Sequence, residues 1–153
     1  MDNTNLKKYI EQTGVVAEIL TMKGRVHSVA AASKELGVPA DHFIKTVVFT
    51  SHEEKPILAI VKGTDRASSK RIGNALGISR PNLATPEEAF ELTGYAVGGT
   101  PPVGIRNARV LIDPKVMDMN TVIGGGGTDH HLLKIAPKEI VKATNGKVTR
   151  VRK

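Results

Sequence analysis

The sequence contains no cysteine, and its aromatic residues, two tyrosines and three phenylalanines, make up only 3% of it. The absence of cysteine excludes disulfide bonds, thiolate nucleophiles and zinc sites with cysteine ligands, and it fits a reducing compartment. Proteins that read single-stranded nucleic acid by stacking normally expose several aromatic rings, so we do not expect a base-stacking surface.

Long hydrophobic runs are also missing. No apolar stretch approaches the roughly 18 residues that a membrane-spanning helix needs. The first five residues, MDNTN, contain no basic region leading into an apolar one, as a signal peptide would. These absences predict a cytoplasmic protein with no membrane contact.

The residues that are present have the composition of a small basic globular domain. Hydrophobic residues make up 40% of the chain and charged residues 24%, and the 153 residues suit one domain with a single core. The net charge of +7 favours a polyanionic partner, contacted mainly through phosphate and sugar. An inert basic surface would have the same composition.

Turn signals and apolar patterns divide the chain into alternating helices and strands. Helices are expected over 4–13, 29–36, 65 or 68 to 76, 86–93 and 137–143. Strands are expected over 15–22, 43–49, 56–61, 109–113, 121–123, 132–136 and 147–151. Because hairpins are mixed irregularly with crossovers, the pattern predicts one α+β domain, residues 1–153, with a mixed sheet.

The most distinctive stretch is a loop at 94–104, GYAVGGTPPVG. Gly98 and Gly99 can adopt backbone angles that other residues avoid, whereas Pro101 and Pro102 each fix φ at about −65° and lack an N–H donor. We expect a loop of fixed shape with unused amides, suited to an oxyanion or a carbonyl group, and the donors left are Gly98, Gly99, Thr100, Val103 and Gly104. The alternative is a rigid connector between two elements.

Lys45 interrupts the apolar strand expected at 43–49. Lysine is rarely buried without a reason, and two placements are open. Its stem can lie over apolar neighbours on the solvated face of an edge strand. Its ammonium can instead point into a cavity, where it would pair with phosphate or polarise an oxygen.

A second glycine cluster, at 124–127, is followed by Thr128, Asp129, His130 and His131. Ordering four glycines costs chain entropy, so the run is either a mobile hairpin tip or a place where a ligand lies against the backbone. Adjacent residues of a strand point to opposite faces, so His130 and His131 are poorly placed to share an ion, and no metal is expected.

Other catalytic signatures are missing. The GTDR stretch at 63–66 lies between a strand and a helix but lacks the spacing of a phosphate-binding P-loop, and no GxSxG motif occurs. An enzyme with this sequence would act by positioning and backbone electrostatics rather than through a strong protein nucleophile.

Taken together, these segments resemble the YbaK and prolyl-tRNA synthetase editing-domain family of aminoacyl-tRNA deacylases. The resemblance runs from about residue 28 to the C-terminus. It rests on five ordered stretches: LGVP (36–39) with IKTVVF (44–49), KRIGNALG (70–77), LATPEE (83–88) with LTGY (92–95), GGTPPVG (98–104), and the glycine cluster with APKE (136–139). The resemblance implies a mostly antiparallel curved sheet flanked by helices.

The family resemblance also implies an activity. The implied protein is a freestanding hydrolase that removes wrongly attached amino acids from tRNA, in particular tRNA for proline carrying Ala or Cys. No cofactor is implied. The expected partners are the acceptor end of mischarged tRNA and, as a further candidate, prolyl-tRNA synthetase, and a monomer is favoured.

Individual residues match the family's functional positions. Lys45 matches an essential lysine placed near the terminal adenosine of the tRNA, and 98–102 matches a GxxxP loop whose amides hold the substrate around the scissile ester. The glycine cluster and His131 match a segment that lines the amino-acid pocket, although relatives often have Arg-Gly in place of Asp129 and His130. The implied catalytic residues are Lys45, Gly98, Gly99 and Thr100, and the implied substrate-binding residues are Lys45, Pro101, Pro102, Gly125, Gly126, Gly127 and His131.

Two other functions stay open on the same fold. One is a noncatalytic module that binds tRNA or a synthetase, and the other is a small-molecule esterase or a binder of phosphate ligands. The editing interpretation requires the Lys45 ammonium and the 98–102 loop to meet across a cleft small enough for a modest side chain.

Overall fold

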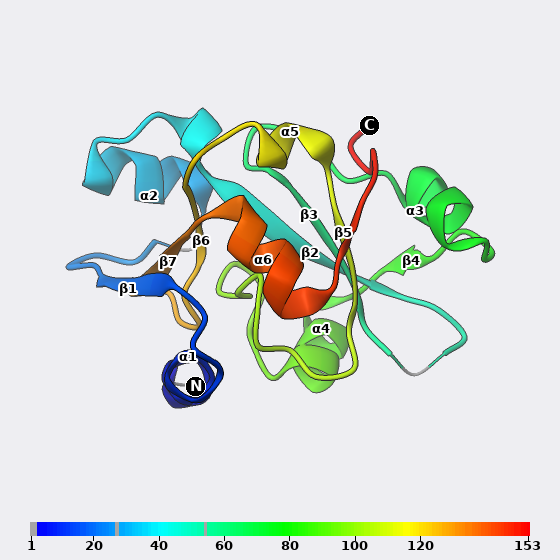
Figure 1. Ribbon diagram of the computed structural model, residues 1–153, viewed down its shortest axis with the longest axis horizontal. Coiled ribbons are helices and arrows are strands. Elements are labelled where there is room, and N and C mark those ends of the chain that lie inside the picture. The colour runs from blue at the N-terminus through cyan, green and yellow to red at the C-terminus, as the bar shows by residue number, and fades with distance from the viewer. Residues whose placement is uncertain (1–2, 27, 54) are drawn as a thin grey trace.

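The computed structural model describes residues 3–26, 28–53 and 55–153 (Figure 1). Its larger sheet contains, in spatial order, β4 (Asn82–Leu83), β2 (Ile44–Thr50), β3 (Ile57–Lys62), β5 (Arg109–Ile112) and β8 (Lys147–Val148). Strand β2 is antiparallel to β3 and β4, whereas β5 is parallel to β3 and β8. The continuously apolar β3 lies in the middle of the sheet, where all its residues except the last are buried.

A second sheet is smaller and entirely antiparallel. Its strands are β1 (Ala17–Thr21), β7 (His131–Ile135) and β6 (Val122–Gly125), in that order. A bridge between Phe43 and Ile123 connects this sheet to the chain just before β2. The predicted class, a single α+β domain with mostly antiparallel strands, is confirmed, with the strands divided between two sheets.

Helices pack around both sheets. They are α1 (Thr4–Thr13), α2 (Val29–Leu36), α3 (Ser69–Leu76), α4 (Pro86–Thr93), α5 (Pro114–Met117) and α6 (Pro137–Thr144), with a 3₁₀ turn η1 (Ala40–His42) before β2. The predicted start of α4 is confirmed, since Thr85 and Glu88 form a reciprocal capping box. Gly94 ends α4 in the left-handed conformation, with φ 81°, and turns the chain into the 94–104 loop.

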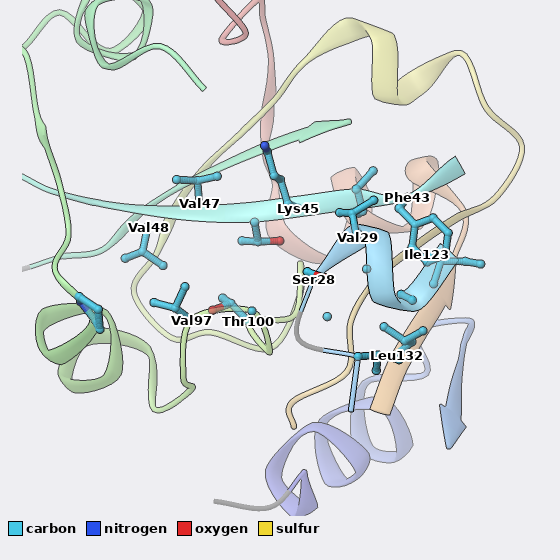
Figure 2. Close-up of a pocket in the computed structure, with 18 of the residues that line it drawn as sticks. Ser28, Val29, Phe43, Lys45, Val47, Val48, Val97, Thr100, Ile123 and Leu132 are labelled. Carbon is cyan, nitrogen blue, oxygen red and sulfur yellow. The ribbon is translucent and has the colours of Figure 1, made fainter. Parts of the chain in front are cut away.

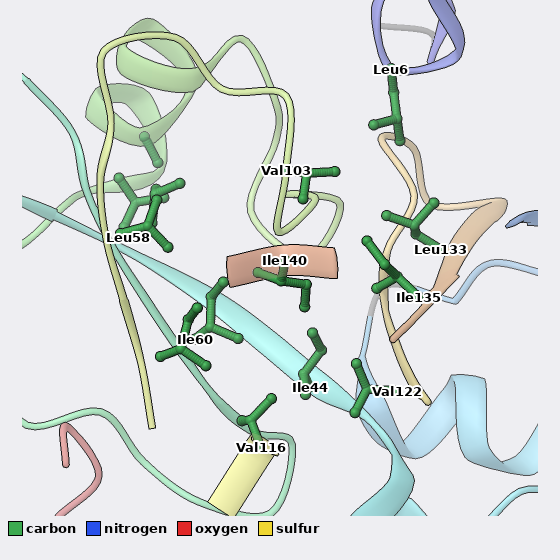
Figure 3. Packing of buried hydrophobic residues seen from close by; sticks show 14 residues of the cluster. Leu6, Ile44, Leu58, Ile60, Val103, Val116, Val122, Leu133, Ile135 and Ile140 are labelled. Atoms are coloured by element: carbon green, nitrogen blue, oxygen red, sulfur yellow. The ribbon is translucent and has the colours of Figure 1, made fainter. Parts of the chain in front are cut away.

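The main hydrophobic core joins the two sheets (Figure 3). It brings together residues from α1, β2, β3, the 94–104 loop, β6, β7, α5 and α6, among them Leu6, Ile44, Leu58, Ile60, Val103, Val116, Val122, Leu133, Ile135 and Ile140. Figure 1 shows α6 crossing in front of the five-stranded sheet. Because Val103 belongs to this core, the end of the 94–104 loop is fixed relative to both sheets.

Two features of the larger sheet differ from the sequence expectation. Strand β4 was not expected, because both of its residues are exposed and so leave no alternating apolar pattern. Strand β8 ends at Val148 rather than at residue 151, because the following segment pairs elsewhere. There Ser68 N–H donates to Val151 O (2.6 Å) and Lys153 N–H donates to Arg66 O (2.8 Å).

The buried carboxylate of Asp113 fixes this C-terminal segment. Its Oδ1 accepts from the backbone N–H groups of Val151 (3.0 Å) and Arg152 (3.1 Å), and its Oδ2 accepts from Arg152 Nη1 (2.9 Å) and Lys115 N–H (3.1 Å). Burial raises the pKa of Asp113, but these hydrogen bonds outweigh burial and hold the pKa below its ordinary value.

We expect Asp113→Asn to lower the free energy of unfolding by about 3 kcal/mol near neutral pH, because it leaves Arg152 without its partner. A depressed carboxylate pKa stabilises the fold above the unfolded pKa of about 3.9, and this contribution is lost as the pH falls through the folded pKa. The variant should therefore lose less stability on acidification than the wild type. Urea unfolding, measured at several pH values from neutral down through the folded pKa of Asp113, gives both the loss of stability at neutral pH and its dependence on pH.

Asp118→Asn is the matched control, since Asp118 is an exposed carboxylate close in sequence. Equal stabilities of the two variants near neutral pH would contradict the role assigned to Asp113.

Candidate active site

A cavity of about 420 Å³ lies beside β2 (Figure 2). It runs along the edge of β2 that is left free between the Phe43–Ile123 bridge and the pairing with β4 at Phe49. Its walls come from α2, β2, β4, the start of α4, the 94–104 loop, β6 and β7. The lining residues are Val26, Ser28, Val29, Ala32, Phe43, Ile44, Lys45, Thr46, Val47, Val48, Leu83, Ala84, Pro86, Val97, Gly98, Thr100, Ile123, Gly124, Gly125 and Leu132.

The two ends of the cavity differ. Figure 2 shows Val29, Phe43 and Ile123 gathered at one end, where Phe43 and Ile123 are buried. At the other end lies Val97, whose exposed fraction of 62% marks an opening to solvent. A closed apolar end suits a small apolar group, and an open end allows a larger ligand to enter.

The 94–104 loop is held by its own backbone and by buried prolines. Gly99 N–H donates to Ala96 O (3.0 Å), so the prediction of a free amide is wrong at this position. Gly99 O accepts from Gly127 N–H (2.9 Å), which ties the loop to the glycine cluster. Pro101 and Pro102 are buried, and they stabilise the loop without lining the cavity.

Gly98 and Thr100, on either side of Gly99, both line the cavity. Gly98 has φ 91°, a conformation that favours glycine. Within the described part of the chain, neither backbone N–H has a hydrogen-bond acceptor. Two unpaired amides beside a cavity are suited to an oxyanion that develops during attack on a carbonyl.

The glycine cluster packs closely against the 94–104 loop and β7. A Cβ added to Gly125 would overlap Thr100 O, and one added to Gly126 would overlap the backbone of His131. Gly127, with φ 100°, packs against Asn3 in the same way. The absence of side chains is therefore needed for packing, which accounts for the glycines without a mobile hairpin tip.

Of the cluster, Gly124 and Gly125 line the cavity, whereas Gly126 and Gly127 lie outside it. His131 also lies outside, and its Nδ1 is 2.6 Å from Thr128 Oγ1. Burial lowers the pKa of His131, and the positive charges of Lys7 and His130 lower it further. A neutral imidazole bonded to a threonine fits a structural role in the turn before β7.

Lys45 is half-buried and lines the cavity, but its ammonium does not face the 94–104 loop. Figure 2 shows the Lys45 side chain on one side of β2 and Val97 and Thr100 on the other. The expected face-to-face arrangement is therefore wrong, although Lys45 and the loop share one cavity across the edge of the strand.

Burial and two nearby charges act on the Lys45 ammonium. Burial lowers the pKa of Lys45, the positive charge of Arg66 lowers it further, and Asp65 partly offsets both effects. Arg66 and Asp65 belong to the loop between β3 and α3, so the charges of that loop reach the ammonium. Because burial and Arg66 both oppose the charged form of Lys45, a bound anion would stabilise it.

Thr46 is a polar cavity residue that the sequence analysis did not single out. Its buried Oγ1 has no hydrogen-bond partner among the described residues, and the residue lines the cavity. A buried hydroxyl without a hydrogen-bond partner lowers the stability of the fold. Its presence here points to a ligand that supplies the missing hydrogen bond. The sequence gives no signal of this role, because the β-branched side chain of threonine makes it common in strands of any function.

The backbone of Thr46 faces the same free edge. Phe43 O accepts from Gly63 N–H (2.7 Å) on the β3 side, whereas Val48 O accepts from Ala84 N–H (3.0 Å) on the opposite side. Backbone groups alternate in direction along an antiparallel strand. The N–H and C=O of Thr46 therefore point away from β3, toward the cavity.

The described residues lack two further features. They contain no group of three His, Cys, Asp or Glu side chains arranged to hold a metal ion. None of their helices has both the length and the apolar composition to cross a bilayer.

Comparison with known proteins gives matches to the sequence and to the fold of this chain. The model of the aminoacyl-tRNA editing domain matches residues 23–143. Among curated proteins, the proline–tRNA ligase of Nitratidesulfovibrio vulgaris is 35% identical over 112 residues, which are 72% of this chain and 19% of the ligase. The proline–tRNA ligase of Streptococcus thermophilus is 33% identical over 110 residues. The chain thus spans about a fifth of the length of these relatives.

Two solved structures match over nearly the whole chain. A protein described as hypothetical is 30% identical, with a TM-score of 0.90, covering 97% of this chain and 99% of its own. A putative trans-editing enzyme for prolyl-tRNA synthetase is 26% identical, with a TM-score of 0.88, covering 99% of this chain and 96% of its own.

The orientation of Lys45 is open to a direct test. We expect Arg66→Gln to raise the pKa of Lys45 toward its ordinary value, because the substitution removes a positive charge that opposes protonation. Titration of the lysine side chain by NMR measures the shift. Lys134→Gln, an exposed cation on β7, is the control, and equal Lys45 pKa values in the two variants would contradict the orientation toward Arg66.

Proposed function

The chain belongs to the aminoacyl-tRNA editing domain family, and we propose that it hydrolyses the ester of mischarged tRNA as a freestanding editing factor. The proposed substrate is tRNA for proline that carries a small wrong amino acid, Ala or Cys. The observation that carries the proposal is one cavity lined by Lys45, Thr46, Gly98 and Thr100, in which the Thr46 hydroxyl and the amides of Gly98 and Thr100 have no partner among the described residues.

The reaction needs little from the protein. Water adds to the ester carbonyl carbon, the bond between that carbon and the ribose oxygen breaks, and the free amino acid leaves a tRNA with its terminal hydroxyl restored. The amides of Gly98 and Thr100 would stabilise the negative charge that develops on the carbonyl oxygen, and losing one such donor typically costs about 10²–10³-fold in rate. Thr46 would orient the aminoacyl group through its hydroxyl and free backbone groups.

Lys45 has a separate role in this scheme. Because its ammonium lies across the β2 edge from Thr100, it is suited to bind a phosphate of the terminal nucleotide rather than the carbonyl oxygen. The substrate would then lie across the edge of β2, with its ester beside the loop and its phosphate beside Lys45.

The apolar end of the cavity supports selection of a small side chain. A synthetase gains only about 1–3 kcal/mol from one methylene, so smaller amino acids enter its active site and a second, smaller site must remove them. Val29, Phe43 and Ile123 offer no polar partner for a hydroxyl, which favours Ala and Cys over Ser.

The similarity to proline–tRNA ligases supports tRNA for proline as the substrate and prolyl-tRNA synthetase as a candidate partner. We expect the protein to release Ala and Cys from charged tRNA for proline faster than Ser or the correct proline. Release of free amino acid from each charged tRNA measures this order. Binding without any release would favour the noncatalytic module, and hydrolysis of simple esters with little salt dependence would favour the small-molecule esterase.

Lys45→Ala should abolish deacylation while leaving the fold intact, because the phosphate loses its cation and the ester is no longer positioned. Hydrolysis rates and thermal melting of the variant, beside those of Lys134→Ala, check both statements. Unchanged hydrolysis by the Lys45 variant would remove the central assignment.

Thr46→Val should have opposite effects on activity and stability. Valine keeps the shape of threonine but removes a buried hydroxyl that has no protein partner, so we expect the free energy of unfolding to rise by about 1 kcal/mol. The same change should slow deacylation by about tenfold or more, since the hydroxyl is proposed to contact the substrate. Thr50→Val, on the same strand but outside the cavity, is the control. A Thr46 variant with wild-type activity would exclude that contact.

A further inference from the structure

A group of cations lies on two segments that pair with each other at the end of β3. Residues 66–71 are RASSKR and residues 149–153 are TRVRK, and neither segment contains an acidic residue. The backbone joins them through a bridge between Ala67 and Arg152 and a hydrogen bond from Lys153 N–H to Arg66 O (2.8 Å). We call their exposed cations the basic ridge, which consists of Arg66, Lys70, Arg71, Arg150 and Lys153.

The basic ridge lacks counterions. None of its five side chains forms an ion pair with an Asp or Glu in the described part of the chain, and Arg150 donates only to the main-chain oxygens of Arg152 (3.4 Å) and Lys153 (3.3 Å). The remaining cation of the two segments, Arg152, is paired with the buried Asp113 at 2.9 Å and so helps to hold the C-terminal segment in place. The ridge therefore carries a net positive charge, with Asp65 as the nearest acidic residue in the chain, and such a surface attracts polyanions.

Lys70 and Arg71 lie at the start of a helix, where a cation is unfavourable unless an anion binds beside it. Both lie in the first turn of α3, which begins after the capping residue Ser68 and contains no acidic residue in that turn. The positive end of a helix dipole disfavours cations at such positions. Two cations placed against this preference are stabilised when an anion binds over the turn.

The ridge begins where the Lys45 ammonium leaves the cavity. Lys45 pairs with Val61 in the β2–β3 ladder, close in the chain to the turn that leads to Arg66. Figure 2 shows the Lys45 side chain extending away from Thr100. The charge of Arg66 acts on Lys45 and lowers its pKa, so the two cations are neighbours.

We propose that the basic ridge binds the phosphates of the acceptor strand of tRNA, as that strand leaves the cavity past Lys45. This inference rests on the proposed function, since a nucleotide ester in the cavity is covalently continuous with such a strand. Contacts of this kind position the RNA without reading its sequence. They also suit a chain with few aromatic residues for base stacking.

The test measures binding rather than catalysis. Fluorescence anisotropy with an uncharged acceptor-stem minihelix gives the dissociation constant of wild type and variants over a range of salt concentrations. The variants are Lys70→Gln with Arg71→Gln, and Arg150→Gln with Lys153→Gln. Lys138→Gln with Lys142→Gln on α6 makes the same change in charge at exposed positions outside the cavity and the ridge, and serves as the control.

Each pair of ridge substitutions should weaken binding. It should also reduce the magnitude of the slope of log K against log salt by about 1.4 to 1.8, because each lost phosphate contact contributes about 0.7 on a single strand and about 0.9 on a duplex. The α6 pair should leave both quantities unchanged. Ridge variants that bind like the α6 control would overturn the proposal. Thermal melting checks folding, and if one ridge pair unfolds the protein, the other pair carries the test.

Hydrolysis of mischarged tRNA by the wild type, followed in parallel, separates the two proposals. If binding of the minihelix depends on the ridge but the wild type hydrolyses no mischarged tRNA, the proposed function is contradicted, whereas the proposal that the ridge binds RNA is supported. Hydrolysis by the wild type, together with ridge variants that bind the minihelix normally, would contradict the ridge alone.

Discussion

The hydrogen bond from Gly127 N–H to Gly99 O, 2.9 Å long, connects the two glycine-rich loops on which the cavity depends. Around it, Gly125 packs against Thr100 O so closely that no side chain fits between them. The glycine cluster thus gives the 94–104 loop a fixed position relative to β6 and β7. With the loop fixed, the amides of Gly98 and Thr100 stay beside the free edge of β2 without folding onto other acceptors.

This arrangement leaves several polar groups unsatisfied at one place. The Thr46 hydroxyl and the amides of Gly98 and Thr100 have no partner among the described residues, and the Lys45 ammonium lies close to Arg66. Each of these features lowers stability, and the large core that joins the two sheets offsets the loss. Their concentration around one cavity is typical of a site completed by its ligand.

Much of the fold could be predicted from the sequence, because its signals are local. The capping box at Thr85, the apolar run of β3 and the end of α4 at Gly94 each depend on a few neighbouring residues. The site was predicted less completely. Loop glycines and Lys45 stand out in the sequence, but the direction of the Lys45 side chain and the use of the Gly99 amide depend on contacts between distant segments. Thr46 was missed because its lack of a partner is visible only in three dimensions.

In the proposed complex, an aminoacyl ester lies across the free edge of β2, between the 94–104 loop and Lys45. Amide chemical shifts, recorded by NMR while an alanyl-adenosine analogue with a stable amide linkage is added, test this placement. We expect the largest shifts at Thr46, Gly98 and Thr100, together with a shift of the Lys45 side chain. Saturable shifts confined to residues outside the cavity, such as Arg80 and Asn82, would contradict it.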